Sequence, residues 1–151
     1  MYNASGMVKE EPGRILAVDW GLKRIGLAVS DPTQTIAYPL AVIKHTSRSK
    51  DAQQIKRVAA EKNASRIVVG AMKNEENELS PSGRSAQRLA EEIGKIVEVP
   101  VSLFPEDETT ISAKKEAQKM GLSQRKRRGH LDSLAASIIL QQYLDRQQNE
   151  K

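Results

Sequence analysis

Residues 14–31 read R-I-L-A-V-D-W-G-L-K-R-I-G-L-A-V-S-D and decide the fold. Two apolar runs, 15–18 and 25–29, have the length and the β-branched content of buried strands. The four residues 20–23 between them are short enough for a hairpin turn, and the glycine among them can take a positive φ. A carboxylate closes each run, Asp19 the first and Asp31 the second.

Asp19 occupies a position where a charged group is costly, the end of a buried strand, unless something pairs with it. Gly21, where the backbone can approach a ligand, follows two residues later, and Lys23 and Arg24 come shortly after it. One interpretation is a metal bound to phosphate, with the metal on Asp19 and the phosphate on the basic pair. The other is that Asp19 only starts a turn, as aspartate often does.

The composition bounds the class of protein and the kind of metal site. The 151 residues suit one domain, and with 38% hydrophobic but 3% aromatic residues the core is expected to consist of Val, Ile, Leu and Ala. Cysteine is absent, which excludes disulfides and thiolate metal sites. Any metal would rest on oxygen ligands, with His45 and His130 as the sole nitrogen donors, and this favours Mg²⁺ or Mn²⁺.

The charge and hydropathy indicate which partners are compatible with the chain. The net charge of +5 and the pI of about 9.5 permit binding to nucleic-acid phosphates. The few aromatic residues argue against readout of single-stranded bases by stacking. No apolar run approaches 18 residues and no signal peptide is visible, so we expect a soluble cytoplasmic protein without a membrane partner.

We expect one domain over residues 14–146, between a flexible N-terminal tail at 1–13 and a C-terminal tail at 147–151. Beyond the hairpin, strands are expected at 36–43, 66–70 and 100–104, and helices at 51–61, 85–97, 109–120 and 131–144. Pro39 argues for an edge position or a bulge in the first of these strands. The expected caps are Ser47 or Ser49 for the first helix and Thr109 or Thr110 for the third.

This order predicts an α/β fold with a five-stranded mixed sheet, an antiparallel meander followed by parallel strands, flanked by helices. Ligands in such sheets gather at the carboxyl ends of parallel strands. Asp19 ends the first strand, and Glu106, Asp107 and Glu108 follow the fifth. If the two strands are parallel neighbours, these acids meet at one rim and could hold two cations for phosphoryl transfer.

The last helix contributes a further acid, Asp132, behind a basic run. Asp132 is in helical phase with the largely apolar Ala136, Ile139 and Tyr143, so it lies toward the core side of the helix and could be a metal ligand. The alternative is that Asp132, as a carboxylate in the first helical turn, stabilises the helix dipole. The run Arg125, Lys126, Arg127 and Arg128 is either a solvated loop or a phosphate-binding surface beside the metals. His130 could cap the helix or contact phosphate, and a solvated role is favoured.

The motifs described above resemble the YqgF (RuvX-like) family, which is described both as nucleases of pre-16S rRNA and as Holliday junction resolvases. The resemblance runs from Arg14 to Asp145 and is most specific in its first and last blocks. It is carried by residues 19–31, Ile67-Val68-Val69-Gly70, Glu106 with Thr109-Thr110, Lys126-Arg127, Leu131-Asp132-Ser133-Leu134-Ala135-Ala136, Ile139-Leu140-Gln141 and Tyr143-Leu144.

The resemblance implies an RNase H-like fold and a metal-dependent nuclease site with Asp19, Glu106 and Asp132 as acids and Lys23 and Arg24 as the basic pair. The chain departs from the family pattern in two places. Residues 71–76 lack the usual proline, and the stretch before the threonines has Pro105 for an aspartate and Asp107 for an arginine. The second change leaves open whether Asp107 or Glu108 replaces Glu106 as ligand.

The sequence therefore favours an Mg²⁺- or Mn²⁺-dependent endonuclease acting on structured nucleic acid, RNA or branched DNA. The family favours processing of the 5′ end of pre-16S rRNA, with ribosomal precursor particles as partners, over Holliday junction resolution. A resolvase would need two sites, hence a homodimer, and the sequence leaves monomer and homodimer open. A third hypothesis is a non-catalytic RNA- or ribosome-binding factor with the same fold. An actin-like ATPase or sugar kinase is disfavoured because 151 residues leave no room for a second lobe.

Overall fold

The computed structural model describes the backbone of residues 13–120 and 124–150 and the side chains of 13–118 and 133–150. Its elements follow in the order β1 (Arg14–Asp19), β2 (Arg24–Ser30), β3 (Ala37–Lys44), α1 (Arg48–Glu61), β4 (Ala64–Lys73), α2 (Pro81–Gly94), β5 (Val101–Asp107), α3 (Glu108–Met120) and α4 (Gln124–Asn149). The α/β class expected from the sequence is confirmed.

The five strands form one mixed sheet in the order β3-β2-β1-β4-β5. Strands β1, β2 and β3 pair antiparallel, whereas β4 lies parallel to both β1 and β5. This is the predicted meander followed by parallel strands. Pro39 lies on the edge strand β3, next to the point where the register with β2 shifts between Leu27 and Ala28. Proline has no N–H to donate, and at an edge strand this does not interrupt the hydrogen bonds of a central strand pair.

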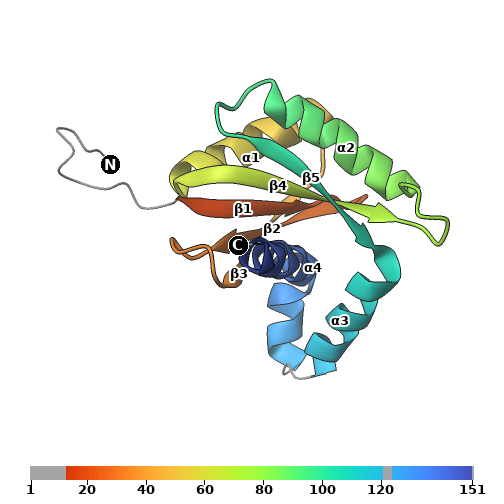
Figure 1. Ribbon diagram of the computed structural model, residues 1–151. Helices are drawn as coiled ribbons and strands as arrows, with labels where there is room; N and C mark the ends of the chain where they lie inside the picture. Colours follow the sequence, from red (N-terminus) through yellow and green to blue (C-terminus); the bar gives the residue numbers. More distant parts are fainter. Residues whose placement is uncertain (1–12, 121–123, 151) are drawn as a thin grey trace.

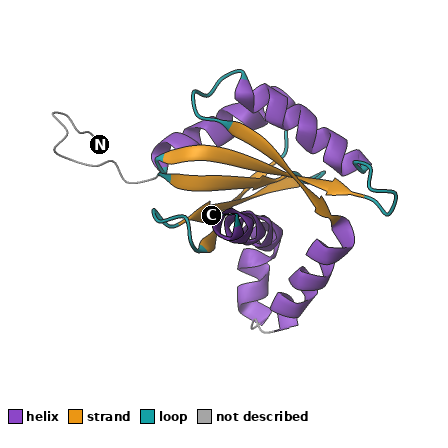
Figure 2. Cartoon of the chain, viewed as in Figure 1, coloured by secondary structure: helices purple, strands orange, loops and turns teal. Residues whose placement is uncertain are grey.

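Helices cover both faces of the sheet (Figure 1). Helices α1 and α2 lie on one face, and α4 crosses the other, while α3 leads from the end of β5 down to the start of α4 (Figure 2). None of the helices in the described ranges combines the length and the apolar character needed to cross a bilayer.

Each face of the sheet has its own apolar core, because successive residues of a strand point to opposite faces. The core under α4 contains Ile15, Ala17, Val68, Phe104, Ile139, Leu140 and Leu144. The core under α1 and α2 contains Leu16, Val18, Ile25, Ile55, Ile67, Val69, Leu89 and Ile93. The alternation continues to the strand ends, so that Asp19 and Glu106 fall on the α4 face.

The helix starts were predicted with mixed success. Ser47 caps α1 by accepting a hydrogen bond from the Lys50 N–H, which confirms one of the two expected caps. The start of α2 was predicted too late, because the helix begins at Pro81, where the Ser80 hydroxyl accepts from the Gly83 N–H at 3.1 Å. A Cβ on Gly83 would lie 2.3 Å from the Met72 carbonyl oxygen, so the first turn of α2 packs directly on β4.

Two predictions near the C-terminal half were also wrong in detail. Strand β5 continues through Asp107, whose Oδ1 accepts hydrogen bonds from the N–H groups of Thr109 and Thr110 at 2.8 and 3.1 Å. Asp107 thus takes the capping role expected of the threonines. Helix α4 is longer at both ends than the predicted 131–144.

Candidate active site at the carboxyl ends of the parallel strands

Asp19 lies between two glycines at the end of β1. Its cross-strand partners are Gly26 on β2 and Gly70 on β4, so no side chain flanks its carboxylate from either neighbour. A Cβ on Gly70 would lie 2.7 Å from Cδ1 of Ile139, so α4 packs directly against this point of the sheet. The local sequence therefore leaves room around a carboxylate while bringing α4 close to it.

The environment of Asp19 disfavours its charged form. Burial raises the pKa of Asp19 to about 6, and the positive charge of Lys115 on α3 opposes that shift. A carboxylate whose pKa is raised by desolvation, and which has a cation nearby, is a candidate for a functional group. Lys115 was not found from the sequence, because it follows Lys114 in a polar helix and nothing in that pattern distinguishes it.

Glu106 is the second acid on the α4 face, and its side chain is 4% exposed. It pairs with Met72 on β4, one strand away from β1 and two residues beyond the level of Asp19. Its Oε1 lies 3.1 Å from Nη2 of Arg146, but within the described residues no donor has hydrogen-bond geometry to that oxygen. A buried carboxylate oxygen without a donor is costly, and a cation would satisfy it.

Asp107 and Glu108 are both exposed and do not join Glu106. Asp107 faces away as the cap of α3, and Glu108 lies in the first turn of that helix. Of the three consecutive acids, Glu106 alone is buried. Among these three acids, burial on the α4 face therefore favours Glu106 as the candidate metal ligand.

Asp132 and the basic residues Arg125, Lys126, Arg127 and Arg128 belong to α4, but their side chains, like that of His130, lie outside the described residues. Among the side chains that are described, no three acids or histidines come together as a metal site. The structure therefore brings Asp19 and Glu106 to one face of the sheet and leaves the placement of the third predicted ligand as a prediction.

Lys23 and Arg24 lie at the hairpin between β1 and β2. Together with Leu22, Lys44 and His45 they line an open hollow of about 620 Å³. Lys23 is exposed, and its carbonyl oxygen accepts a hydrogen bond from the His45 N–H at 2.9 Å. The predicted basic pair is thus part of a larger basic surface that includes Lys44.

The donor set suits a hard divalent cation. Both described acids offer oxygen ligands, burial disfavours the ionised form of Asp19, and Glu106 has an oxygen without a donor. A cation bound to these oxygens would relieve both conditions. Oxygen-only ligands favour Mg²⁺ or Mn²⁺.

A family model described as RuvX, Holliday junction resolvase, matches residues 13–146. A relative from Thermoanaerobacter pseudethanolicus is 39% identical over 91% of this chain and 99% of its own length, and one from Roseiflexus sp. is 33% identical over 93% and 99%. Both relatives carry the name "Putative pre-16S rRNA nuclease".

Solved structures support the fold. The RuvC of T. thermophilus in complex with a Holliday junction substrate superposes with a TM-score of 0.54 at 20% identity, over 91% of this chain and 96% of the other. The Fowlpox virus resolvase in complex with Holliday junction DNA gives a TM-score of 0.51 at 14% identity, over 89% and 98%. These likenesses confirm the RNase H-like fold that the family resemblance predicted.

Proposed function

The chain belongs to the RuvX family, and from this premise we propose that it is a metal-dependent endonuclease that processes the 5′ end of precursor 16S rRNA. The single observation that carries the proposal is the pair Asp19 and Glu106. Both acids lie on the α4 face at the carboxyl ends of parallel strands, and Glu106 has a buried oxygen without a hydrogen-bond donor among the described residues.

The residues would divide the work as follows. Asp19, Glu106 and Asp132 would hold one or two cations, and the chemistry supplied by a bound cation would be activation of water and stabilisation of the leaving oxygen. Lys23 and Arg24, with the basic run at 125–128, bind the phosphate backbone on either side.

Lys115 has a supporting part in this scheme. Its charge opposes the effect of burial on Asp19 and so helps to keep that carboxylate ionised near neutral pH. Because Lys115 is itself only partly exposed, its charge is screened less by water than that of a surface lysine.

A cleavage assay tests the proposal. The substrates are a 5′-labelled RNA spanning the precursor 16S 5′ junction and a labelled four-way DNA junction, each with Mg²⁺, Mn²⁺ or EDTA. We expect cleavage of the RNA that requires the metal and falls at least a hundredfold in Asp19→Asn and Glu106→Gln. Glu108→Gln is the matched control, since Glu108 is exposed two residues from Glu106. Metal-dependent cutting that survives Asp19→Asn would refute the assigned site.

Holliday junction resolution is the second candidate, favoured by the description of the matching family. Cutting of the junction but not of the RNA, by a dimer in solution, would establish it in place of RNA processing. Binding of RNA without any cleavage would instead support the non-catalytic factor. Under the main proposal the protein works in the cytoplasm on ribosomal precursor particles.

A further inference from the structure

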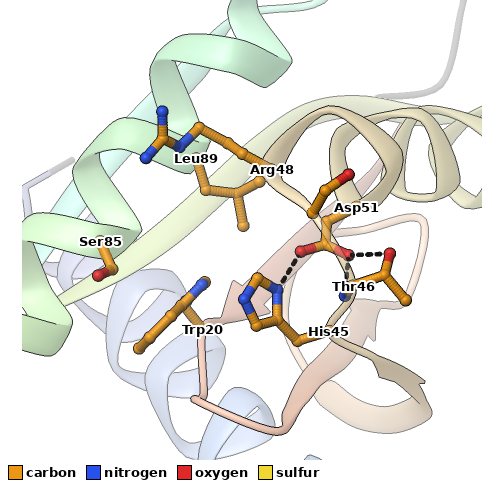
Figure 3. A pocket seen from close by; sticks show the side chains of 8 residues that line it. Trp20, His45, Thr46, Arg48, Asp51, Ser85 and Leu89 are labelled. Atoms are coloured by element: carbon orange, nitrogen blue, oxygen red, sulfur yellow. Dashed lines mark hydrogen bonds and ion pairs between the residues drawn. The ribbon is translucent and has the colours of Figure 1, made fainter.

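A second cavity lies on the face of the sheet that α1 and α2 cover, opposite the α4 face on which Asp19 lies. Figure 3 shows its lining residues from close by. Its volume is about 290 Å³. Four segments build it: Trp20 directly after β1, residues 45–47 after β3, the first turn of α1, and α2 at Ser85 and Leu89. Its main lining residues are Trp20, His45, Arg48, Asp51, Ser85 and Leu89.

A fully buried acid fixes the histidine of this cavity. The side chain of Asp51 is 0% exposed, and its Oδ2 is hydrogen-bonded to Nδ1 of His45, while Oδ1 accepts from the Thr46 N–H at 3.0 Å. A carboxylate can only accept, so Nδ1 carries the proton of that bond. The other ring nitrogen of His45 points away from Asp51 and toward Trp20 (Figure 3).

Trp20 and Arg48 complete a set of groups that suits a nucleotide. The rings of Trp20 and His45 are 5.6 Å apart at an interplanar angle of 65°, an edge-on contact. Trp20 is the single tryptophan of the chain, and its indole can stack with a base. Arg48 is exposed at the first position of α1, where its guanidinium can pair with a phosphate.

The surroundings favour an anionic ligand that continues beyond the cavity. The one acid in the lining, Asp51, is buried and hydrogen-bonded, so its charge does not face the cavity mouth. On its other side, His45 belongs to the basic hollow with Lys23 and Lys44. A nucleic-acid strand bound along that hollow would reach the cavity with its phosphates in contact with basic residues.

We propose that this cavity binds one unpaired nucleotide of the nucleic-acid substrate, with the base against Trp20 and the phosphate beside Arg48 and His45. Its volume of about 290 Å³ is close to the lower end of the range of small-molecule sites, roughly 300–1,000 Å³, so the cavity has room for no more than one nucleotide. Trp20 directly follows Asp19 in the chain but lies on the other face of the sheet, so the bound nucleotide would lie at the same end of the sheet as Asp19, across the sheet from it. The proposal rests on the proposed function and adds a site for one unpaired nucleotide on the face of the sheet opposite Asp19.

Fluorescence of Trp20 tests this directly, since no other residue contributes tryptophan emission. A single-stranded hexaribonucleotide is titrated into the full chain in EDTA, where no cleavage occurs, and binding is followed in parallel by anisotropy of the labelled RNA. We expect saturable quenching that weakens about tenfold in Arg48→Ala. Lys50→Ala is the matched control, because Lys50 is exposed on the same helix and does not line the cavity. Equal weakening by both variants would overturn the proposal.

A second variant tests the cavity without a change of charge. Ser85→Met fills the space beside Trp20, and we expect loss of quenching in a protein that keeps its far-ultraviolet dichroism. Binding by anisotropy with unchanged Trp20 emission in the wild type would refute the site. Adenosine monophosphate is the other probe: binding as tight as that of the hexanucleotide would assign the cavity to free nucleotides and overturn the strand assignment.

The two proposals fail separately. Quenching in EDTA with no cleavage in Mn²⁺ would leave the nucleotide site standing and refute the nuclease function. Cleavage that requires Asp19, without quenching of Trp20, would support the nuclease function and refute the nucleotide site.

Discussion

Arg146 lies with its Nη2 3.1 Å from Oε1 of Glu106, and the same guanidinium lies over the ring of Phe104, with Cζ 4.7 Å from the centroid. The carboxylate is buried, whereas the Arg146 side chain is 57% exposed. The ion pair neutralises Glu106 without hydrogen-bond geometry to Oε1. Arg146 therefore occupies the place beside Glu106 for which a divalent cation would compete.

Arg146→Gln should strengthen binding of Mn²⁺, because it removes the positive charge that competes for Glu106. We expect a rise in affinity of about tenfold, equivalent to about 1.4 kcal/mol, measured by calorimetry. Arg88→Gln is the control, since Arg88 is exposed on α2. Weaker Mn²⁺ binding by Arg146→Gln would mean that Arg146 instead holds the carboxylate in position for the metal.

Asp19 should make the metal-free protein less stable as pH rises. Its pKa is raised by burial from 3.8 to about 6, so the unfolded chain releases its proton first. The stability linked to Asp19 is full below about pH 4 and is lost as pH rises through 6. Asp19→Asn should thus be more stable than wild type at pH 7, by up to about 3 kcal/mol, with a much smaller difference at pH 4.

Urea denaturation in EDTA at the two pH values measures this difference. Glu91→Gln separates the effect of Asp19 from a general loss of acidic charge, because Glu91 is exposed on α2. Equal stability of wild type and Asp19→Asn at pH 7 would show that burial of Asp19 carries no cost.

Gly70→Ala should push α4 away from the sheet at the site. The new Cβ would meet Cδ1 of Ile139 at 2.7 Å in a buried core, and such overpacking costs roughly 1–3 kcal/mol. Ile139→Val removes the contacting methyl, so it should restore part of the stability and of the Mn²⁺ affinity in the double variant. Thermal melts and calorimetry follow both quantities.

Gly94→Ala is the matched control for this substitution. A Cβ on Gly94 would meet nothing within 4 Å, and alanine in a helix is favoured over glycine by up to about 1 kcal/mol. A Gly70→Ala protein as stable as Gly94→Ala would contradict the close packing of α4 on β4.

Lys23→Ala should weaken binding of RNA to a similar extent for all sequences and reduce the slope of log affinity against log salt by about 1, as expected for the loss of one phosphate contact. Lys95→Ala is the control, because Lys95 is exposed at the end of α2 and pairs with Glu92. Anisotropy titrations at several salt concentrations measure the slope. An identical slope for the two variants would remove the hairpin from the binding surface.

Local patterns predicted the fold well, because strands and turns depend mainly on residues that are close together in the sequence. The two apolar runs around Asp19 gave the hairpin, and Pro39 placed β3 at the edge, since proline breaks a central ladder. The start of α2 was missed because Ser80 and Pro81 look like loop residues. Their role as cap and first helical residue depends on the packing of Gly83 against β4, which no local pattern reveals.

The positions of two of the predicted acids could be derived from the sequence for the same reason, and their role as a site stays a prediction. Asp19 and Glu106 follow from the ends of strands and from the family motif, and both lie on the α4 face. Arg146 and Lys115 were not predicted, because they reach these acids from helices far along the chain. Exposed cations are common in such helices, so only the tertiary structure distinguishes these two.

Titration of Mn²⁺ by calorimetry tests the central claim most directly, that Asp19 and Glu106 form one metal site. The wild type, Asp19→Asn, Glu106→Gln and the control Glu108→Gln are compared at pH 7.5. We expect binding heat in the wild type and in Glu108→Gln, and its loss in each of the other two variants. Equal binding heat in all four proteins would contradict the account.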